Sequence, residues 1–562
     1  MIDRAPDPDS LTVRKQNHTM PVLNWIGKAA VVKHHKDVPT RLLEPVAELS
    51  CGATDSGNLI VQGDNLQALK ALLPRYAGQV KCIYIDPPYN TGNEGWAYND
   101  NVNSPEIRKW LGEVVGKEGE TLDRHDRWLC MMYPRLVLLK QFLREDGSIW
   151  ISMDESEIAH LRILMDEIFG RHRFVACNAW QKRYSRENRG AIGDVHEYVL
   201  VYAMNKDLFQ ETRNRVPIDE RQAAVYKNPN NDPKGRWRGI PMTAQGFRPN
   251  QMYEIETPSG KRIKPPEGRC WSTIESEFLK LKAAGRIYFG KDGSAQPNVI
   301  RYLSEVEGFV PWTWWPHEEV GHTDESRKEV QDIFGTQTAF DTPKPTRLLQ
   351  RILQIATDKD SLILDSFAGS GSTAHAVLKQ NAEDGGHRPF ILVEMDEGIA
   401  RNVTAERVRR VAQGYTNAKG EKVAGLGSGF QFCRLSAEPL FTADGRIRTD
   451  VRFVELAEYV WFAETGAGRV PPKRSAAKSP LLGVVNGTAV FLLYNGILAD
   501  RSDAGGNVLN GRTLDVLREI AGDFAGPWVV YAARTRFDKT RLNQLGIAFK
   551  QLPYELAVKS WS

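Results

Sequence analysis

Two short motifs, each following a strand-like run of residues, constrain this chain more than any other feature. Residues 80–85 are followed by Asp-Pro-Pro-Tyr at 86–89. Residues 361–365 are followed by Phe-Ala-Gly-Ser-Gly-Ser at 367–372. Strand and helix patterns alternate around both motifs and resume after an interruption between them. This order predicts one doubly wound, Rossmann-like α/β domain interrupted by another domain.

Changes in residue composition and hydrophobic periodicity divide the chain into five segments. Residues 1–54 lack clear periodicity and are expected to form an N-terminal arm. Residues 55–204 and 339–436 carry the strand-helix alternation and are expected to form the two halves of the α/β domain. Between them, residues 205–338 are rich in proline, glycine and aromatic residues. Residues 437–562 are expected to form a further α/β domain at the C-terminal end.

Composition narrows the class of protein. A chain of 562 residues with 41% hydrophobic residues can form three or four globular units. We expect no transmembrane helix, because no run approaches about 18 apolar residues, and no signal peptide is indicated. The six cysteines are scattered without a CxxC pair. This pattern argues against a zinc site and fits reduced thiols in a cytoplasm.

The glycine-rich motif suits a nucleoside cofactor. A small-residue loop between a strand end and a helix start lets the backbone approach such a ligand closely. Its G-x-G-S spacing does not match the dinucleotide fingerprint, and the chain has no G-x-x-x-x-G-K phosphate loop. S-adenosylmethionine needs no phosphate cradle; Phe367 can supply an apolar wall and Glu394 an acid for the ribose hydroxyls. A tight structural turn is the alternative interpretation of this motif taken alone.

The Asp-Pro-Pro-Tyr motif suits the binding of an aromatic amine, which is a poor nucleophile because its lone pair is delocalised. The Asp86 carboxylate and the Pro87 carbonyl offer acceptors for its two N–H bonds, and two prolines stiffen that carbonyl. Tyr89 offers a ring on which an extruded base can stack. A rigid strand-to-loop turn is the structural alternative, which the joint presence of both motifs disfavours.

With these motifs the sequence resembles the β-class DNA amino-methyltransferases. It is most similar to the adenine-modifying subunits of type III restriction-modification systems. The resemblance covers roughly residues 55–435, with the catalytic motif before the cofactor motif as in one permuted group of these enzymes. Six stretches occur in the family's order: GDNLQAL at 63–69, DPPYNTG at 86–92, EDGSIWISMDE at 145–155, HEYVLVYA at 196–203, FDTPKPTRLL at 340–349 and FAGSGST at 367–373.

The resemblance implies roles for the matching positions. The target-base site would comprise Asp86, Pro87, Pro88 and Tyr89. The cofactor site would comprise Asp64, Thr342, Lys344, Asp365, Phe367, Gly369, Gly371 and Glu394. Within it, Glu394 would bind the ribose and Asp64 would lie near the adenine. Thr342 and Lys344 would approach the methionine end. An aspartate before Pro-Pro-Tyr favours adenine over cytosine as the methyl acceptor.

Basic residues in two segments are candidates for DNA contacts. Residues 182–189 interleave basic and aromatic side chains after a strand and can clamp phosphates near a flipped base; a solvated loop is the alternative. Residues 206–269 hold thirteen Lys or Arg against eight Asp or Glu. In the family the inserted region, residues 205–338 in this chain, is the target recognition domain. The candidate contacts are Lys182, Arg183, Arg186, Arg189, Lys234, Arg236 and Arg238.

Together these features predict a site-specific DNA methyltransferase that modifies the N6 amino group of a flipped adenine with S-adenosylmethionine. No metal is expected to be required. Expected partners are double-stranded DNA, a restriction (nuclease/helicase) subunit and, by resemblance, a second copy of the chain. Cytosine amino-methylation remains an alternative. A second alternative is a DNA-recognition subunit that positions a nuclease partner.

Overall fold

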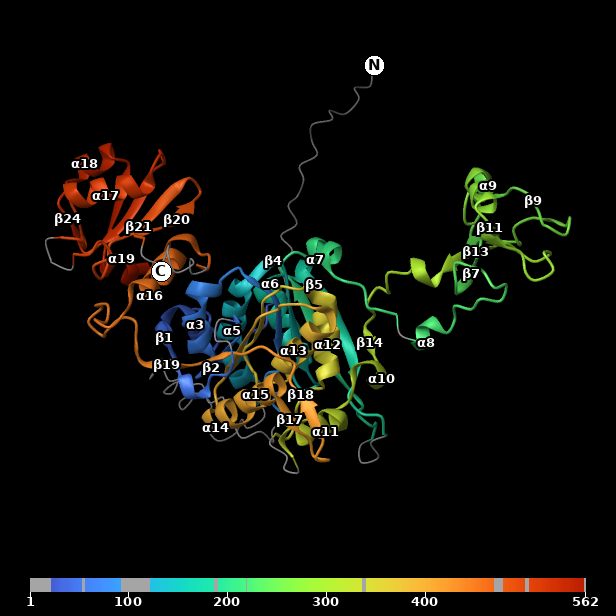
Figure 1. Ribbon diagram of the computed structural model, residues 1–562, viewed down its shortest axis with the longest axis horizontal. Helices are drawn as coiled ribbons and strands as arrows, with labels where there is room; N and C mark the ends of the chain where they lie inside the picture. Colours follow the sequence, from blue (N-terminus) through green and yellow to red (C-terminus); the bar gives the residue numbers. More distant parts are fainter. Residues whose placement is uncertain are drawn as a thin grey trace, which may run out of the picture. The chain divides into compact units, whose positions relative to one another are not determined.

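The computed structural model forms two compact units, residues Met1–Arg213 with Trp312–Ser562 and residues Asn214–Pro311 (Figure 1). Each unit has its own sheets and hydrophobic cluster. The structure describes residues 22–52, 56–91, 122–185, 191–218, 220–335, 340–469, 479–500 and 505–559. Among the helices in these ranges, none is both long and apolar enough to cross a membrane.

A ten-stranded sheet forms the centre of the larger unit, in the order β1-β19-β2-β16-β15-β3-β4-β6-β5-β14. The six strands from β19 to β4 are parallel, and β6 runs antiparallel to β4. The strands are β1 (Arg41–Pro45), β2 (Leu59–Gln62), β3 (Val80–Ile85), β4 (Leu143–Met153), β5 (Phe174–Gln181), β6 (His196–Ala203), β14 (Trp314–Trp315), β15 (Ile363–Asp365), β16 (Phe390–Glu394) and β19 (Gln431–Pro439).

The strand order shows how the two halves of the α/β domain combine. Strands β15 and β16, from the second half of the chain, lie between β2 and β3 of the first half. The register pairs Ile363 of β15 with Cys82 of β3, and Ile363 also with Phe390 of β16. The predicted doubly wound α/β fold, split by an insertion, is therefore confirmed.

Helices cover both faces of this sheet, which explains why every residue of β3 is buried. Helices α3 (Asn65–Tyr76), α5 (Leu122–Phe142) and α6 (Ile158–Phe169) share one hydrophobic cluster with the strands. The layer in front of the sheet in Figure 1 comprises α12 (Thr346–Ala356), α13 (Ser372–Asp384) and α15 (Glu406–Gln413).

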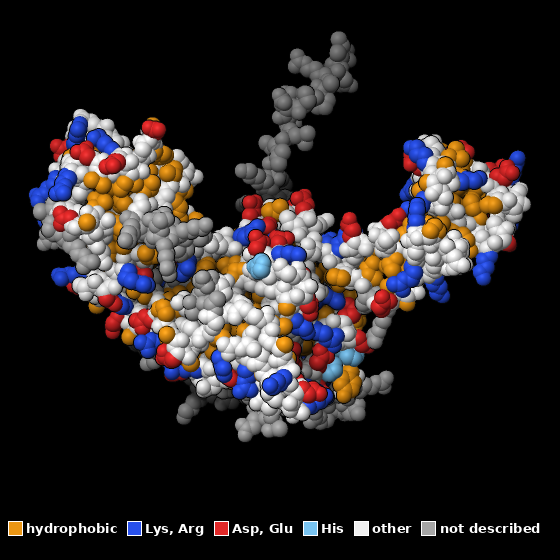
Figure 2. Space-filling view, in the orientation of Figure 1, with side chains coloured by type: hydrophobic (Ala, Val, Ile, Leu, Met, Phe, Trp, Pro, Cys, Tyr) orange, Lys and Arg blue, Asp and Glu red, His pale blue; other side chains and the backbone are white. Residues whose placement is uncertain are grey.

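The smaller unit consists of short strands and the helices α8 (Glu220–Ala223) and α9. A three-stranded sheet orders β12, β13 and β7, and two strand pairs, β11-β8 and β10-β9, complete it. Its elements are β7 (Trp237–Pro241), β8 (Thr243–Gln245), β9 (Ile255–Glu256), β10 (Arg262–Ile263), β11 (Arg269–Trp271), α9 (Glu275–Ala283), β12 (Ile287–Tyr288) and β13 (Asn298–Tyr302). Lys and Arg side chains stand at several places on its visible face, among hydrophobic ones (Figure 2).

The segments that flank this unit belong to the larger one. Helices α7 (Lys206–Thr212) and α11 (Thr323–Phe334) and strand β14 lie there. The unit itself is therefore shorter than the inserted segment 205–338.

The last part of the chain adds a second sheet, ordered β20-β21-β23-β25. Helix α16 (Phe453–Thr465) packs on it and against α3. Two backbone hydrogen bonds join the segment after α16 to the end of α3: Gly468 N–H donates to the Ala77 carbonyl at 2.9 Å and Arg469 N–H to the Pro74 carbonyl at 3.0 Å. The strands are β20 (Leu481–Val485), β21 (Thr488–Leu492), β23 (Trp528–Ala532) and β25 (Ile547–Gln551).

Candidate active site

A pocket of about 600 Å³ lies where β3 and β15 end. These strands are parallel neighbours, so the loops that follow them emerge at the same edge of the sheet. The two sequence motifs therefore face one cavity. Predicted residues that line it are Asp86, Pro87, Pro88, Tyr89, Lys182, Thr342, Lys344, Asp365, Phe367 and Gly369.

The Asp86 carboxylate opens onto this pocket with 23% of its side chain exposed. Both of its oxygens accept hydrogen bonds from the Lys344 ammonium, at 2.8 and 2.6 Å. Burial raises the pKa of Asp86 above its ordinary value, against the opposing effect of Lys344. The pKa of Lys344 is raised as well, because the Asp86 and Glu197 carboxylates outweigh the effect of its burial. The two residues form a partly buried ion pair at the predicted amine site.

Tyr89 is held by contacts at both of its ends. Its hydroxyl donates to Glu197 Oε2 at 3.0 Å, and the Lys344 ammonium lies 4.9 Å from its ring centre. The preceding peptide is anchored separately, since the Trp128 indole N–H donates to the Pro88 carbonyl at 2.7 Å. These contacts orient the Tyr89 ring at the pocket wall.

The glycine loop is tied to the end of the neighbouring strand β16. Gly369 N–H donates to Glu394 Oε2 at 2.8 Å, and Asp396 N–H donates to Oε1 at 3.0 Å. Glu394 is only 3% exposed, and burial raises its pKa. Gly369 has φ of +48°, and a Cβ there would lie 3.1 Å from the Phe340 ring, so the position favours glycine.

Asp365 and Gly371 shape the two ends of the same loop. The Asp365 carboxylate accepts from the Phe367 N–H at 2.9 Å and from the Thr373 hydroxyl. Its burial raises its pKa to about 7. Gly371, with φ of +75°, is the N-cap residue of α13. The loop is thereby closed by side chains from both flanking elements.

Arg407 contacts this loop from α15, a role that the sequence motifs did not indicate. Its guanidinium is fully buried and donates to Ser370 Oγ at 3.0 Å and Ser372 Oγ at 2.8 Å. Glu329 balances the charge at 3.0 Å. Burial lowers the pKa of Arg407, but a guanidinium stays protonated at neutral pH. A π-helical turn at Ala400–Ala405 adds Thr404, whose hydroxyl donates to the Gly369 carbonyl at 2.6 Å.

Asp64 lies outside the set of residues that line the pocket. Its Oδ1 accepts from Gln67 N–H at 2.9 Å and so caps α3. Its Oδ2 lies 3.2 Å from the buried Arg135 guanidinium. The structure therefore gives Asp64 a capping role, and its predicted place near the cofactor adenine stays a prediction.

The DNA-contact candidates are divided in the structure. Lys182 is ion-paired with Asp194 at 2.7 Å and lies 3.5 Å from Glu197, at the rim of the pocket. Arg183 follows it, and Arg186 and Arg189 lie outside the described residues. Lys234, Arg236 and Arg238 are exposed on the smaller unit.

Sequence reasoning missed several residues of this site, and three of them make contacts described above. Glu197 belongs to the HEYVLVYA stretch, which was recognised as a family motif, but its own place at the site was not predicted. Phe340 opens the FDTPKPTRLL stretch and meets Gly369. Arg407 had no motif that could have revealed it.

The fold and the site define a class: a doubly wound α/β protein in which an Asp-Pro-Pro-Tyr loop and a glycine loop share one pocket. A family model described as DNA methylase, of the N6/N4 type, matches residues 80–406, more than half of the chain. The chain belongs to this family.

Similar proteins include a type III Mod subunit and a type II enzyme. The StyLTI Mod subunit of Salmonella typhimurium is 37% identical over 401 residues, which cover 68% of this chain and 60% of that protein. The type II methyltransferase M.KpnI of Klebsiella pneumoniae is 30% identical over 397 residues, covering 64% of this chain and 89% of the enzyme.

The chain thus spans about three fifths of the length of the StyLTI subunit. Among solved structures, a putative DNA modification methylase of Thermus thermophilus, complexed with S-adenosylmethionine, covers 67% of this chain at 13% identity with a TM-score of 0.30.

Proposed function

We propose that this protein transfers a methyl group from S-adenosylmethionine to the N6 amino group of an adenine extruded from double-stranded DNA. The observation that carries the proposal is the shared pocket, in which the Asp86 carboxylate and the Tyr89 ring face the glycine loop held by Glu394. Membership of the DNA methylase family supports the reaction class. The type III and type II relatives support a role in a restriction-modification system.

The pocket residues fit S-adenosylmethionine. Phe340 and Phe367 line the pocket and provide an apolar wall. Glu394, at the end of β16, is outside the set of lining residues; it holds Gly369 and is the proposed acceptor for ribose hydroxyls. The Lys344 ammonium is the cation for a carboxylate at the methionine end. When bound, the cofactor supplies an electrophilic methyl group. The glycine loop brings the backbone close to it without a side chain in the way.

The Asp86 carboxylate and the Pro87 carbonyl accept hydrogen bonds from the two N–H groups of the adenine amino group. The amino group then shares Asp86 with Lys344 or displaces it, because the Lys344 ammonium contacts both Asp86 oxygens in this structure. Glu197, 3.8 Å from the ammonium, is the nearest alternative partner. Binding of the cofactor carboxylate and binding of the base are therefore coupled through one lysine.

Positive charge develops on the amino nitrogen as the methyl group arrives. Asp86 and Glu197 flank the site and stabilise that charge in a partly desolvated cavity. Tyr89 stacks on the extruded base while its hydroxyl stays on Glu197. The surplus proton leaves by way of Asp86. Alignment of the two reactants in one pocket contributes much of the rate.

The unit Asn214–Pro311 is the proposed target recognition domain. Its exposed Lys234, Arg236 and Arg238 flank the buried Trp237 and are suited to phosphate contacts. Further proposed partners are a restriction subunit, which would supply ATP-driven cleavage, and a second copy of the chain. The family resemblance to type III Mod subunits supports both.

The test is single-molecule sequencing of DNA from cells that express this chain, beside Asp86→Ala and Asp86→Asn controls. N6-methyladenine in one short motif, absent from both controls, is expected. N4-methylcytosine would establish the alternative base instead. Absence of any modified base, with sequence-specific DNA binding retained, would favour a recognition subunit that positions a nuclease partner. The purified Asp86→Ala protein should still bind S-adenosylmethionine, since Asp86 lies on the base side of the pocket.

A further inference from the structure

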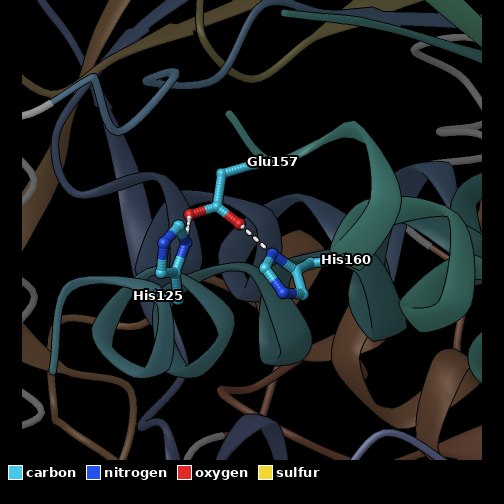
Figure 3. A group of neighbouring side chains, drawn as sticks. All are labelled: His125, Glu157 and His160. Carbon is cyan, nitrogen blue, oxygen red and sulfur yellow. Dashed lines mark hydrogen bonds and ion pairs between the residues drawn. The ribbon is translucent and has the colours of Figure 1, made fainter. Parts of the chain in front are cut away.

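His125, Glu157 and His160 form a compact cluster outside the set of residues that line the active-site pocket (Figure 3). His125 Nδ1 lies 2.6 Å from Glu157 Oε1, and His160 Nδ1 lies 2.8 Å from Oε2. One ligand atom from each residue lies within 4.8 Å of the others. The two imidazoles thus face the two oxygens of a single carboxylate, as the close-up shows.

Two helices supply the three side chains. His125 comes from the first turns of α5, whereas Glu157 directly precedes α6 and His160 stands in its first turn. Both helices belong to one hydrophobic cluster. The backbone positions of the cluster are therefore set by the core, so its geometry does not depend on a surface loop.

The burial of Glu157 is the unusual feature. Its side chain is fully buried, and in the described part of the chain its recorded ion-pair partners are the two histidines. Burying a carboxylate is costly unless a positive charge compensates it. Imidazoles supply hydrogen bonds, and they supply positive charge only when they are protonated. A divalent cation between the three side chains would supply that positive charge directly.

The donor set indicates which cations fit. Two imidazole nitrogens and one carboxylate oxygen suit zinc and the other late first-row divalent ions better than magnesium or calcium, which prefer oxygen ligands. The imidazoles are 30% and 36% exposed, so solvent reaches the cluster and a water molecule could complete the coordination of an ion. Metal–ligand bonds of about 2.0–2.2 Å require the present N···O separations to widen modestly.

We propose that His125, Glu157 and His160 bind a divalent metal ion of the zinc class. The scattered cysteines of the sequence argued against a zinc site. That expectation concerns thiolate ligands, whereas this site uses histidine and carboxylate ligands. Methyl transfer itself needs no metal, so the ion has a structural role.

The cluster also contacts the loop that carries the Asp-Pro-Pro-Tyr motif, so a bound ion would stabilise that loop. The side-chain amide of Asn90 donates to Glu157 Oε1 and, at 3.2 Å, to the Arg124 carbonyl. Asn90 directly follows Tyr89, is 1% exposed and has φ of +61°. An ion that fixes Glu157 therefore also fixes Asn90 and the end of the Asp-Pro-Pro-Tyr loop. This second part rests on the proposed function, whereas metal binding does not.

Metal binding is tested on the full-length protein without DNA or cofactor. Chelator-stripped protein is titrated with Zn²⁺ by calorimetry and with Co²⁺ by visible absorption. We expect one equivalent of each ion. His125→Ala and His160→Gln should weaken binding at least about tenfold, whereas the exposed His387→Ala should not. His160→Gln is the safer variant because its side chain is partly exposed; circular dichroism checks that each variant is folded.

Absence of binding in the wild-type protein would overturn the proposal and leave a purely hydrogen-bonded cluster. Binding that His160→Gln and His125→Ala do not weaken would place the ion elsewhere and would overturn it equally. Because neither readout uses methyl transfer, a failure of the proposed function leaves this test intact.

The coupling to the loop needs a separate comparison. Removing the metal should lower the methylation rate of the wild-type protein, but not that of Asn90→Ala, in which the connection is already broken. Equal dependence on metal in the two proteins, or none in the wild type, would refute the coupling.

Discussion

The Lys344 ammonium lies 2.6 Å from one oxygen of the Asp86 carboxylate and 2.8 Å from the other, although the two residues are 258 positions apart. Asp86 follows β3 in the first half of the α/β domain, and Lys344 precedes α12 in the second half. This ion pair joins the base side of the pocket to the cofactor side. In the proposed reaction the amino group competes with Lys344 for the Asp86 carboxylate.

Replacing Lys344 should change the pH dependence of methylation. Without the ammonium, the main effect that opposes burial is lost, and the pKa of Asp86 rises further. Because the ionised carboxylate is the acceptor, Lys344→Met should move the acidic limb of the pH–rate profile to higher pH. One pKa unit corresponds to about a tenfold loss on that limb. Lys344→Arg, which keeps the charge, should shift the limb much less; an identical profile for Met and wild type would contradict this role.

Two substitutions distinguish the contribution of the Tyr89 ring from that of its hydroxyl. Tyr89→Phe keeps the stacking surface and loses the hydrogen bond to Glu197, so we expect a few-fold loss. Tyr89→Ala loses the stacking, worth about 1–3 kcal/mol. Fluorescence of 2-aminopurine at the target position reports base extrusion and should fall in Tyr89→Ala only. Equal losses in both variants would mean that the hydroxyl, and not the ring, holds the base.

Glu394→Gln tests the support of the glycine loop. The amide has one acceptor oxygen in place of two, so it cannot serve both Gly369 N–H and Asp396 N–H. We expect binding of S-adenosylmethionine, measured by calorimetry, to weaken by at least about tenfold. The matched control is Glu397→Gln, because Glu397 is 64% exposed and pairs only at the surface with Arg401. Unchanged cofactor affinity in Glu394→Gln would remove this residue from the site.

Arg407 should act on the cofactor through Ser370 and Ser372. Arg407→Met leaves the partly buried Glu329 without this charge partner, a loss of about 3 kcal/mol in unfolding free energy. Adding Glu329→Gln should restore much of that stability. Cofactor affinity should stay low in the double variant, because the two serine contacts are still missing. Recovery of both stability and affinity would show that Arg407 has only a structural role.

The elevated pKa of Asp365, about 7, predicts a stability trend with pH. The folded protein keeps this proton up to about pH 7, whereas the unfolded chain releases it near pH 4. Between these values the folded state binds more protons, so the contribution of Asp365 to stability falls as the pH rises. Asp365→Asn should flatten this trend. Urea unfolding at pH 5 and pH 8 measures it, and an unchanged difference between the two pH values would refute the assignment.

The sequence predicted the elements that depend on local patterns. Strand β3, β15 and the two loops that follow them were expected from runs of apolar residues, prolines and closely spaced glycines. The order of the motifs also predicted a split α/β domain, which the position of β15 and β16 between β2 and β3 confirms. Gly369 and Phe367 were expected at the pocket because a short stretch of sequence is enough to recognise the glycine loop.

The sequence could not indicate which distant side chains would meet. The contacts of Arg407 with Ser370, of Glu197 with Tyr89, and of His125 with Glu157 join separate segments, and no local pattern marks them. Asp64 is the opposite case. The motif predicted a long-range role near the cofactor, but in the structure its carboxylate caps the nearby start of α3.

By itself, the sequence determined the chemistry that each loop can offer, because side-chain type and local backbone stiffness are properties of a few neighbouring residues. Only the tertiary structure decided how those groups are charged and paired. The interleaved strands bring Lys344 onto Asp86; burial raises the pKa of Asp86, and the nearby carboxylates raise the pKa of Lys344. Desolvation and long-range ion pairing arise from packing of the whole sheet, so they are determined by the tertiary structure.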